Sequence, residues 1–527
     1  MTMKTKFIYI ALSSALWLTS CSKDFLDRDP LDSYTNESLW SSEKDVLAAI
    51  NGCYNNWEDG YDIIYMDAAS DNAYNQYPWE GYTTLGNGYV TATDPDARNR
   101  WKYKNIQRCN WVLENVDRAP VSDELKQRVK GEARFLRAYQ YFMLTQLYGD
   151  VPLVTQSLTT EEANTISRTP KEEVQQFVLK ELDEIVDWLP ESYSGNDVGR
   201  ITKGAALALK ARLELYRADY SNCITDCEKI MELGYTLYPN YQDLFRIQHE
   251  NNSEVILDIQ YKENDFANEN LHVMVTSSLG GWGSIGPTQA LVDDYEMANG
   301  LTIDEANSGY DANDPYKNRD PRLTASIVCP GEPYEGKFYN SIDPASSDYY
   351  LGDNNSKTGY LVKKFTSNLS DFTELQNNGL NMIVIRYAEV LLNYAEAKIE
   401  SGSIDNTVYD AIDAIRQRAK MPKVDRAKYS DQSSMRELVR RERRVELALE
   451  GLRWFDIARW KNAETLRKGE VYGARLGKVD AKTGKLTLSN EQIRVEKRVF
   501  DPAKNYLWPV PQKERDINKN LTQNPGY

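Results

Sequence analysis

The chain has 527 residues, with 63 lysines and arginines against 79 aspartates and glutamates, which gives a net charge of −16 and a pI near 4.9. This length suffices for two average domains or one large domain with a substantial core. The acidic balance repels polyanions within a Debye length, so nucleic acid is not an expected partner. Only two histidines are present, His249 and His272, which excludes multi-histidine metal sites, and neither lies in a nucleophile motif.

The amino terminus carries the pattern of a lipoprotein export signal. Lys4 and Lys6 precede the apolar run FIYIALSSALWLTS at 7–20, which is shorter than the roughly 20 apolar residues that cross a bilayer. The run ends in leucine, threonine and serine directly before Cys21, which matches the bacterial lipobox. We therefore predict a lipoprotein signal peptide at 1–20 and lipidation of Cys21, a firm anchor because several acyl chains share one residue. An ordinary cleaved signal with a cysteine nearby is the alternative.

The other cysteines give no sign of a disulfide framework. Five remain, an odd number without paired spacing: Cys53, Cys109, Cys223, Cys227 and Cys329. Cys223 and Cys227 lie four residues apart on an expected helix, where a buried pair of small apolar groups is a better interpretation than a metal site. The sequence predicts no catalytic residue, metal ligand or cofactor, and it leaves a structural calcium undecided.

Helical periodicity predicts a mainly α fold. A long amphipathic helix is expected at 122–148, and a capping box at 169–172 opens another that reaches Trp188. Further helices form pairs joined by short turns: 203–218 with 221–233, 387–401 with 405–419, and 435–450 with 454–467. Small and aromatic residues alternate on their inner faces, as in degenerate tetratricopeptide pairs, although a generic helical bundle has similar periodicity.

Three long segments, 58–97, 234–284 and 299–380, are irregular apart from strand-like runs at 255–261 and 381–387. They are rich in Gly, Asn, Asp, Ser and Tyr. Segments of this length are usually functional or disordered, and their aromatic content favours order. We therefore expect the function to depend on these segments.

Residues 281–286, GWGSIG, fit the G-x-G-x-x-G pattern of a dinucleotide-binding turn. Such a turn needs a strand before it, a helix after it and an acidic residue about 20 positions further on, whereas Pro287 follows here without a clear βαβ unit. The better interpretation is flexible backbone that presents Trp282.

The run MRELVRRERRVELALEGLRWFDIARW at 435–460 places Glu442, Glu446 and Glu450 on one helical face. Three carboxylates at this spacing could bind a cation, and a di-iron site in its usual form would also need histidines. Four arginines lie in the same run as the glutamates and favour a salt-bridge lattice instead: Arg443, Arg444, Arg453 and Arg459.

An aromatic stretch without lysine or arginine extends from Tyr54 to Ala97. Rings beside Asp and Asn suit a carbohydrate, because sugar C–H faces stack on the rings while carboxylates or amides bond to vicinal hydroxyls. Any single ring is more often part of a core. Trp79, on a loop between Pro78 and Glu80, is the strongest candidate, and the missing cations argue against a strongly anionic glycan.

The chain resembles the SusD/RagB family of Bacteroidetes surface lipoproteins over essentially its whole length. The resemblance rests on SKDFLDRDP after Cys21, on the helix pairs, on RRERRVELALEGLRWFDIARW at 440–460 and on NYLWPVPQKERDINKNLTQNPGY at 505–527. It implies a single SusD-like domain at 21–527, with an N-terminal part at about 21–235 and a C-terminal part at about 255–527. The implied fold is mainly α, with tetratricopeptide-type helix pairs as scaffold and a large irregular, loop-rich half that binds ligand.

The resemblance also implies a non-enzymatic protein in the outer membrane, lipid-anchored through Cys21 and facing the cell exterior. Such a protein captures an oligosaccharide and delivers it to a SusC-like TonB-dependent transporter. By position, the aromatic arc of glycan-binding members corresponds to Trp79 and Trp282, and their polar or stacking neighbours are Asp67, Asp71, Asn72 and Tyr74. Two alternatives remain, namely peptide import on the same scaffold and a glycoside hydrolase with two carboxylates about 5 to 10 Å apart across a cleft.

Overall fold

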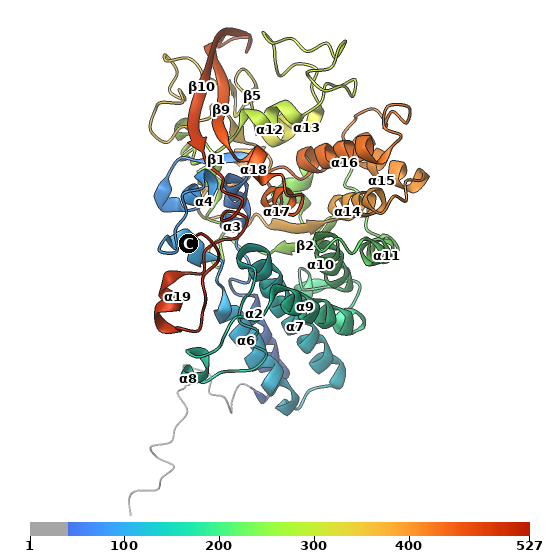
Figure 1. Ribbon diagram of the computed structural model, residues 1–527. Helices are drawn as coiled ribbons and strands as arrows, with labels where there is room; N and C mark the ends of the chain where they lie inside the picture. The colour runs from blue at the N-terminus through green and yellow to red at the C-terminus, as the bar shows by residue number, and fades with distance from the viewer. Residues whose placement is uncertain (1–39) are drawn as a thin grey trace, which may run out of the picture.

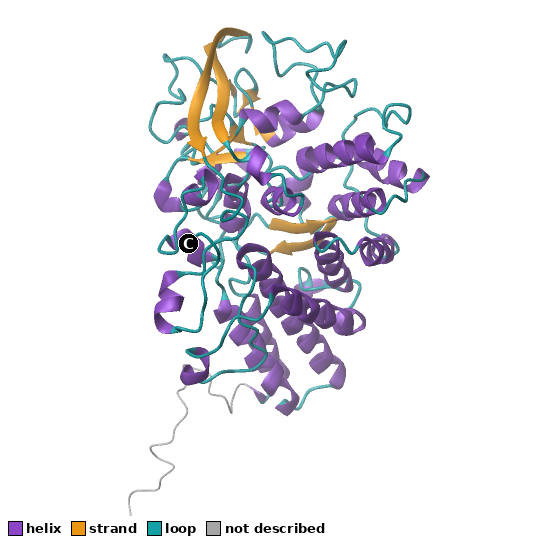
Figure 2. Ribbon diagram, in the orientation of Figure 1, coloured by secondary structure: helices purple, strands orange, loops and turns teal. Residues whose placement is uncertain are grey.

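The fold is described by a computed structural model over residues 40–527, so the predicted signal peptide at 1–20 and the lipidation of Cys21 lie outside the described residues. Paired helices fill one end and one side of the molecule, while most strands and long loops gather above α3 and α4 (Figures 1 and 2). The two-part division predicted at about 21–235 and 255–527 stays a prediction.

The helices account for most of the regular structure. The longer ones are α2 (Glu43–Tyr54), α6 (Tyr103–Asn115), α7 (Asp123–Tyr148), α9 (Lys171–Ile185), α10 (Lys203–Tyr216), α11 (Tyr220–Met231), α14 (Tyr387–Glu400), α15 (Asn406–Arg418) and α16 (Gln432–Glu446). The short ones are α3 (Gly60–Met66), α4 (Thr83–Asn87), α5 (Pro95–Asn99), α8 (Thr160–Ala163), α12 (Gln289–Asp294), α13 (Pro321–Ser326), α17 (Arg453–Arg459), α18 (Ala463–Leu466) and α19 (Gln512–Ile517).

The strands pair in antiparallel twos within the described chain. The pairs are β1 (Ala73–Asn75) with β3 (Ile285–Pro287), β2 (Val255–Ile259) with β8 (Met382–Arg386), β4 (Ile327–Val328) with β7 (Leu361–Val362), β5 (Pro333–Tyr334) with β6 (Lys337–Phe338), and β9 (Gly469–Val479) with β10 (Leu486–Arg498). The strand-like runs predicted at 255–261 and 381–387 are therefore confirmed, and they pair with each other as β2 and β8.

Two of the three predicted helix pairs are confirmed, since α10 packs against α11 and α14 against α15. Small residues permit the close crossings, because Ala205 and Ala206 are fully buried on α10. On α11, Cys223 and Cys227 are both buried and free, as predicted. A hydrogen bond with Cys223, together with burial, raises the pKa of the Cys227 thiol well above its usual value, which keeps this thiol neutral.

The third predicted pair, 435–450 with 454–467, is wrong in its second helix. α16 ends at Glu446, and the following segment divides into the short helices α17 and α18. Positive φ angles at Leu449, Gly451 and Lys461 interrupt the helical backbone. The Gly451 N–H donates to Asp67, so this turn is held against the end of α3.

The capping box predicted at 169–172 is also wrong. The N-cap of α9 is Pro170, with no side-chain cap, because the backbone of Thr169 bonds instead to Val151 in an isolated antiparallel bridge. Asp150 supplies an acceptor from outside the helix, since its Oδ1 lies 2.8 Å from the backbone nitrogen of Lys171.

Glu442, Glu446 and Glu450 form a salt-bridge lattice, as predicted, but their partners come from elsewhere in the chain. These glutamates are buried and pair with Arg322, Arg386, Arg416, Arg418 and Lys364. The four arginines predicted as partners pair with other acids: Arg443 with Asp456, Arg444 with Asp71 and Asp294, Arg453 with Asp71, and Arg459 with Glu396 and Asp456. The glutamate face of α16 points into the core, so neighbouring elements provide the counter-charges.

Candidate ligand-binding surface

A short antiparallel pairing brings two distant segments together. Ala73 lies opposite Pro287 and Asn75 opposite Ile285 in the β1–β3 pair. Gln76 extends the contact: its backbone nitrogen lies 3.0 Å from the Ser284 carbonyl oxygen, and its side-chain amide lies 3.0 Å from the Trp282 carbonyl oxygen. The segments that carry Trp79 and Trp282 are thus adjacent although about 200 positions separate them.

Trp79 is the most exposed large hydrophobic residue of the described chain, at 78%. It lies in a single 3-10 turn, Pro78–Glu80, and its ring stacks on Tyr77 with centroids 4.8 Å apart and planes inclined by 29°. The Tyr77 hydroxyl donates to Asn354 Oδ1 at 2.7 Å. The stack therefore faces solvent as an open aromatic surface while its base is tied to a second loop.

Trp282 is 39% exposed and is fixed by His272. The two rings meet edge to face with centroids 4.2 Å apart, and the backbone N–H of Trp282 donates to the His272 carbonyl oxygen at 2.8 Å. Burial lowers the pKa of His272, so its imidazole is neutral at pH 7. We call the Tyr77–Trp79 stack together with Trp282 the aromatic surface.

The Glu80 side chain links the segment that carries Trp79 to the segment that carries Trp282. The Tyr65 hydroxyl donates to Glu80 Oε2 at 2.6 Å, and the Ser284 hydroxyl donates to Oε1 at 3.0 Å. Tyr61 donates to the Glu80 carbonyl oxygen and stacks on Tyr65 with centroids 4.0 Å apart. Burial raises the pKa of Glu80 above its usual value. The aromatic surface thus rests on a bonded, largely buried base.

The glycines of 281–286 permit close backbone packing. A Cβ on Gly281 would overlap the Val275 carbonyl, and one on Gly283, where φ is +52°, would lie 2.7 Å from the Ser356 nitrogen. Gly286 lies in β3, in an antiparallel pair and not in a βαβ unit. The prediction against a nucleotide turn agrees with this geometry, whereas the expectation of flexible backbone is wrong because three segments pack tightly here.

Gly283→Ala tests this packing. We expect it to destabilise the protein by about 1–3 kcal/mol, since it combines an unfavourable φ with a backbone clash. Gly280→Ala is the matched control, because Gly280 also has a positive φ, +84°, but a Cβ at this position would have no atom within 4 Å. Denaturant unfolding compares the two variants, and equal loss of stability in both would contradict a role for the clash.

The polar residues predicted beside the tryptophans are mostly buried. Asp67 Oδ2 accepts from the Gly451 N–H at 2.7 Å, and burial raises the pKa of Asp67 to about 6. Asp71 pairs with Arg453 at 2.8 Å and Arg444 at 2.9 Å, and Asn72 accepts from Arg444 at 3.0 Å. Direct ligand contact through these three side chains is therefore not supported, because protein partners occupy their polar groups; they connect the β1 segment to α16 and α17.

Tyr74, the remaining predicted residue, is half-buried on β1 opposite Gly286. Burial raises the pKa of its hydroxyl to about 12. Its position beside the β1–β3 pairing is compatible with a stacking or a supporting role, and its contact with ligand stays a prediction.

The loop 349–355 borders the aromatic surface; it lies within the segment 299–380 on which function was expected to depend, but no residue of it was predicted as a site residue. Asn354 accepts from Tyr77, the Asn355 carbonyl oxygen lies 3.2 Å from the Gln76 side-chain amide, and Leu351 is exposed. The composition of this loop, YYLGDNN, matches that of the aromatic stretch around Trp79 and was the available signal.

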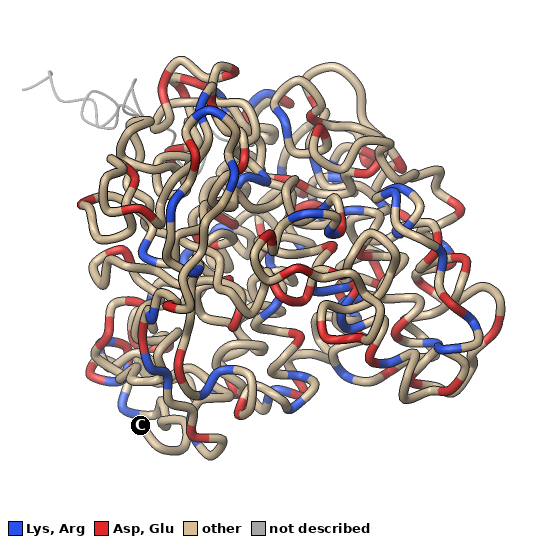
Figure 3. The backbone as a smooth tube through the Cα atoms, turned by 90° about the horizontal axis from the view of Figure 1, so that it is seen from above, with Lys and Arg blue, Asp and Glu red and all other residues tan. Residues whose placement is uncertain are grey.

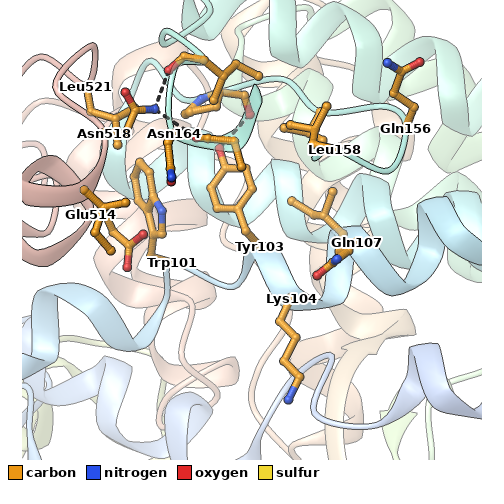
Figure 4. Close-up of a pocket in the computed structure, with 16 residues that line it drawn as sticks. Trp101, Tyr103, Lys104, Gln107, Gln156, Leu158, Asn164, Glu514, Asn518 and Leu521 are labelled. Atoms are coloured by element: carbon orange, nitrogen blue, oxygen red, sulfur yellow. Dashed lines mark hydrogen bonds between the residues drawn. The ribbon is translucent and has the colours of Figure 1, made fainter. Parts of the chain in front are cut away.

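A cavity of about 380 Å³ lies away from the aromatic surface. It is bounded by α6, α8 and α19, with Trp101 and Tyr103 on its wall (Figure 4). The Tyr103 hydroxyl donates to the Pro152 carbonyl oxygen at 2.7 Å. None of the predicted site residues lines it.

The described residues contain no cluster of three or more His, Cys, Asp or Glu side chains placed to hold a metal ion. Nor do residues 40–527 include a helix that is both long and apolar enough to cross a membrane. Acidic and basic residues are interspersed over the backbone in the view of Figure 3.

Comparisons with known proteins identify the family. A family model described as "SusD family" matches residues 245–527, and one described as "Starch-binding associating with outer membrane" matches 24–215. A SusD-like protein of Bacteroides ovatus is 28% identical over 492 residues, 87% of this chain and 83% of that protein. The starch-binding protein SusD of Bacteroides thetaiotaomicron is 24% identical and aligns over the full length of both chains.

Solved structures agree with this result. The crystal structure of a SusD-like carbohydrate-binding protein from Bacteroides fragilis is 31% identical, covers 92% of this chain and 100% of its own, and superimposes with a TM-score of 0.83. A second SusD-like protein from the same species is 30% identical with a TM-score of 0.82. Because the first family match spans more than half of the chain, the protein belongs to the SusD family, and the resemblance and fold class predicted from sequence are confirmed.

Proposed function

We propose that this protein is a cell-surface lipoprotein that binds an oligosaccharide on the aromatic surface and delivers it to a SusC-like TonB-dependent outer-membrane transporter. The observation that carries the proposal is the exposed Tyr77–Trp79 stack, which lies beside the segment of Trp282. Stacked rings that face water suit the C–H faces of a sugar, while neighbouring amides such as Asn354 can bond to hydroxyls. The relatives named as starch-binding and carbohydrate-binding support the ligand class.

The surface favours a neutral saccharide. The groups that support the rings are amides, hydroxyls and the half-buried Glu80, and the stretch from Tyr54 to Ala97 has no cation. Binding of this kind needs no catalyst, so we propose a non-enzymatic role. The lipidated Cys21 would attach the protein to the outer membrane, and the protein would face the cell exterior.

Calorimetry on a soluble Cys21→Ala variant tests the proposal. We expect binding of one or more neutral oligosaccharides and no heat from peptides. Peptide binding without glycan binding would indicate instead that the same scaffold serves peptide import. Release of new reducing ends during incubation would instead indicate a glycoside hydrolase. Co-purification of the lipidated protein with a TonB-dependent transporter tests the delivery step separately.

A further inference from the structure

A second cleft lies between α12 and the base of the β9–β10 hairpin. Its volume is about 220 Å³, and its wall includes two buried arginines, Arg467 and Arg498, with Lys468 beside them. Neither Trp79 nor Trp282 lines it, so it is distinct from the aromatic surface. The sequence interpretation assigned no role to these three cations.

Arg467 is buried without a counter-charge. It is 2% exposed and has no carboxylate within ion-pair distance among the described residues. Its Nη2 donates to the carbonyl oxygens of Leu85 and Gly86, whereas its buried Nε has no acceptor in the described chain. Since a guanidinium group carries five N–H donors, most of the donors of Arg467 are unused.

Arg319 provides a comparison, because it is also buried without an ion-pair partner in the described part of the chain. Both of its terminal nitrogens donate to backbone carbonyls, among them those of Pro315, Val292 and Tyr295 at 2.6 to 2.8 Å. Backbone oxygens thus bond to both terminal nitrogens of Arg319, although its buried Nε also has no acceptor in the described chain, while only one terminal nitrogen of Arg467 has such acceptors. Arg467, unlike Arg319, lines this cleft.

The charges that line the cleft have both signs, but none of them pairs with Arg467. Arg498 pairs with Glu496 at 2.7 Å and also lines the cleft. Burial first, and then the charge of Arg498, lowers the pKa of Arg467 to about 9. Three carboxylates also line the cleft: Asp71 pairs with Arg444 and Arg453, Glu470 pairs with Arg494, and Asp293 accepts from Gln289. None of the three lies within ion-pair distance of Arg467. A buried charge without a partner is costly, and a bound anion would relieve that cost.

We propose that this cleft is an oxyanion site, in which Arg467 binds a carboxylate or sulfate group and Arg498 adds attraction. An oxygen of either group would accept from Arg467 Nη1, which has no acceptor in the described chain, because Nη2 already donates to Leu85 and Gly86. The group could belong to an acidic sugar or to a free inorganic anion. This site goes beyond the proposed function, because a neutral glycan on the aromatic surface does not require it.

Thermal shift and calorimetry with sodium sulfate, sodium glucuronate and glucose test the proposal, with ionic strength held constant by chloride. We expect sulfate to raise the melting temperature and to bind with a roughly millimolar Kd. Binding of glucuronate but not glucose would assign the site to acidic sugars, and binding of sulfate alone would assign it to an inorganic anion. No binding of either anion would overturn the proposal.

Variants separate the cleft from general charge effects. Arg467→Met should abolish the response, but it also removes a cation that lies 4.6 Å above the Trp454 ring, so folding must be checked. Ala290→Glu avoids this problem: Ala290 is exposed on α12 and lines the cleft, and the new carboxylate should weaken sulfate binding at least about tenfold. Lys497→Gln removes an exposed cation of β10 outside the cleft and should leave binding unchanged. Wild-type affinity in Ala290→Glu would contradict the assignment.

Discussion

Trp79→Ala is expected to abolish or severely weaken glycan binding while leaving the melting temperature nearly unchanged. Because 78% of the Trp79 surface is already exposed, its removal uncovers little apolar surface. Loss of one stacking contact costs the complex at least about 1.4 kcal/mol, a tenfold loss of affinity. Calorimetry measures the affinity, and a thermal melt checks the fold.

Trp282→Ala and Tyr89→Ala complete the experiment. Trp282→Ala should have a similar effect on binding, with a small loss of stability because the contact with His272 disappears. Tyr89 is also largely exposed but lies outside the aromatic surface, so Tyr89→Ala should bind as the wild type does. Normal binding by both tryptophan variants would place the ligand elsewhere.

Glu446→Gln is expected to produce the largest loss of stability, about 3–5 kcal/mol, because it breaks a buried ion network from one side. The Glu446 carboxylate is fully buried and lies 2.7 Å from Arg386 and 3.0 Å from Arg322, and it also pairs with Arg418. Neutralising it leaves three buried cations short of a counter-charge. Denaturant unfolding measures the change in free energy.

Glu437→Gln is the matched control, since Glu437 is exposed on the same helix, and its effect should stay within about 0.5 kcal/mol.

The pH dependence of stability gives a second measurement on Glu446→Gln. Burial alone would raise the pKa of Glu446, but Arg418, Arg386 and Arg322 hold it well below its usual range. The carboxylate therefore stabilises the fold above about pH 4 and loses this contribution as the pH falls further. In Glu446→Gln the free energy of unfolding should fall less steeply over this acidic range. The same pH dependence of stability in the variant and the wild type would contradict the role of the network.

Helix periodicity predicted the scaffold well where a helix buries one apolar face, as α11 and α15 do. It failed where the decisive interactions are distant in sequence. The β9–β10 hairpin was missed because its strands are mostly half-exposed and lack regular apolar alternation. The break after Glu446 depends on contacts of Gly451 with Asp67 and Ile63, which sequence spacing does not reveal.

The candidate site shows the same limit. Exposure of Trp79 follows from its loop and its proline neighbour, and sequence reasoning selected it. Position in the family resemblance does not distinguish a carboxylate that faces ligand from one that an arginine neutralises, so it put Asp71 among the neighbours of the ligand although Arg453 pairs with it. The partner of Tyr77 was hidden for a related reason, since Asn354 is 277 positions away.

The close approach of the 281–286 backbone to residues 275 and 354–356 has a thermodynamic consequence. Segments that already touch through their main chains have little conformational freedom left to lose when a ligand arrives. Trp282 is therefore preorganised, and the entropy of ordering it is spent during folding. A saccharide that meets this surface should bind with little rearrangement of the protein, so that free and bound forms differ mainly in the water that covers the rings.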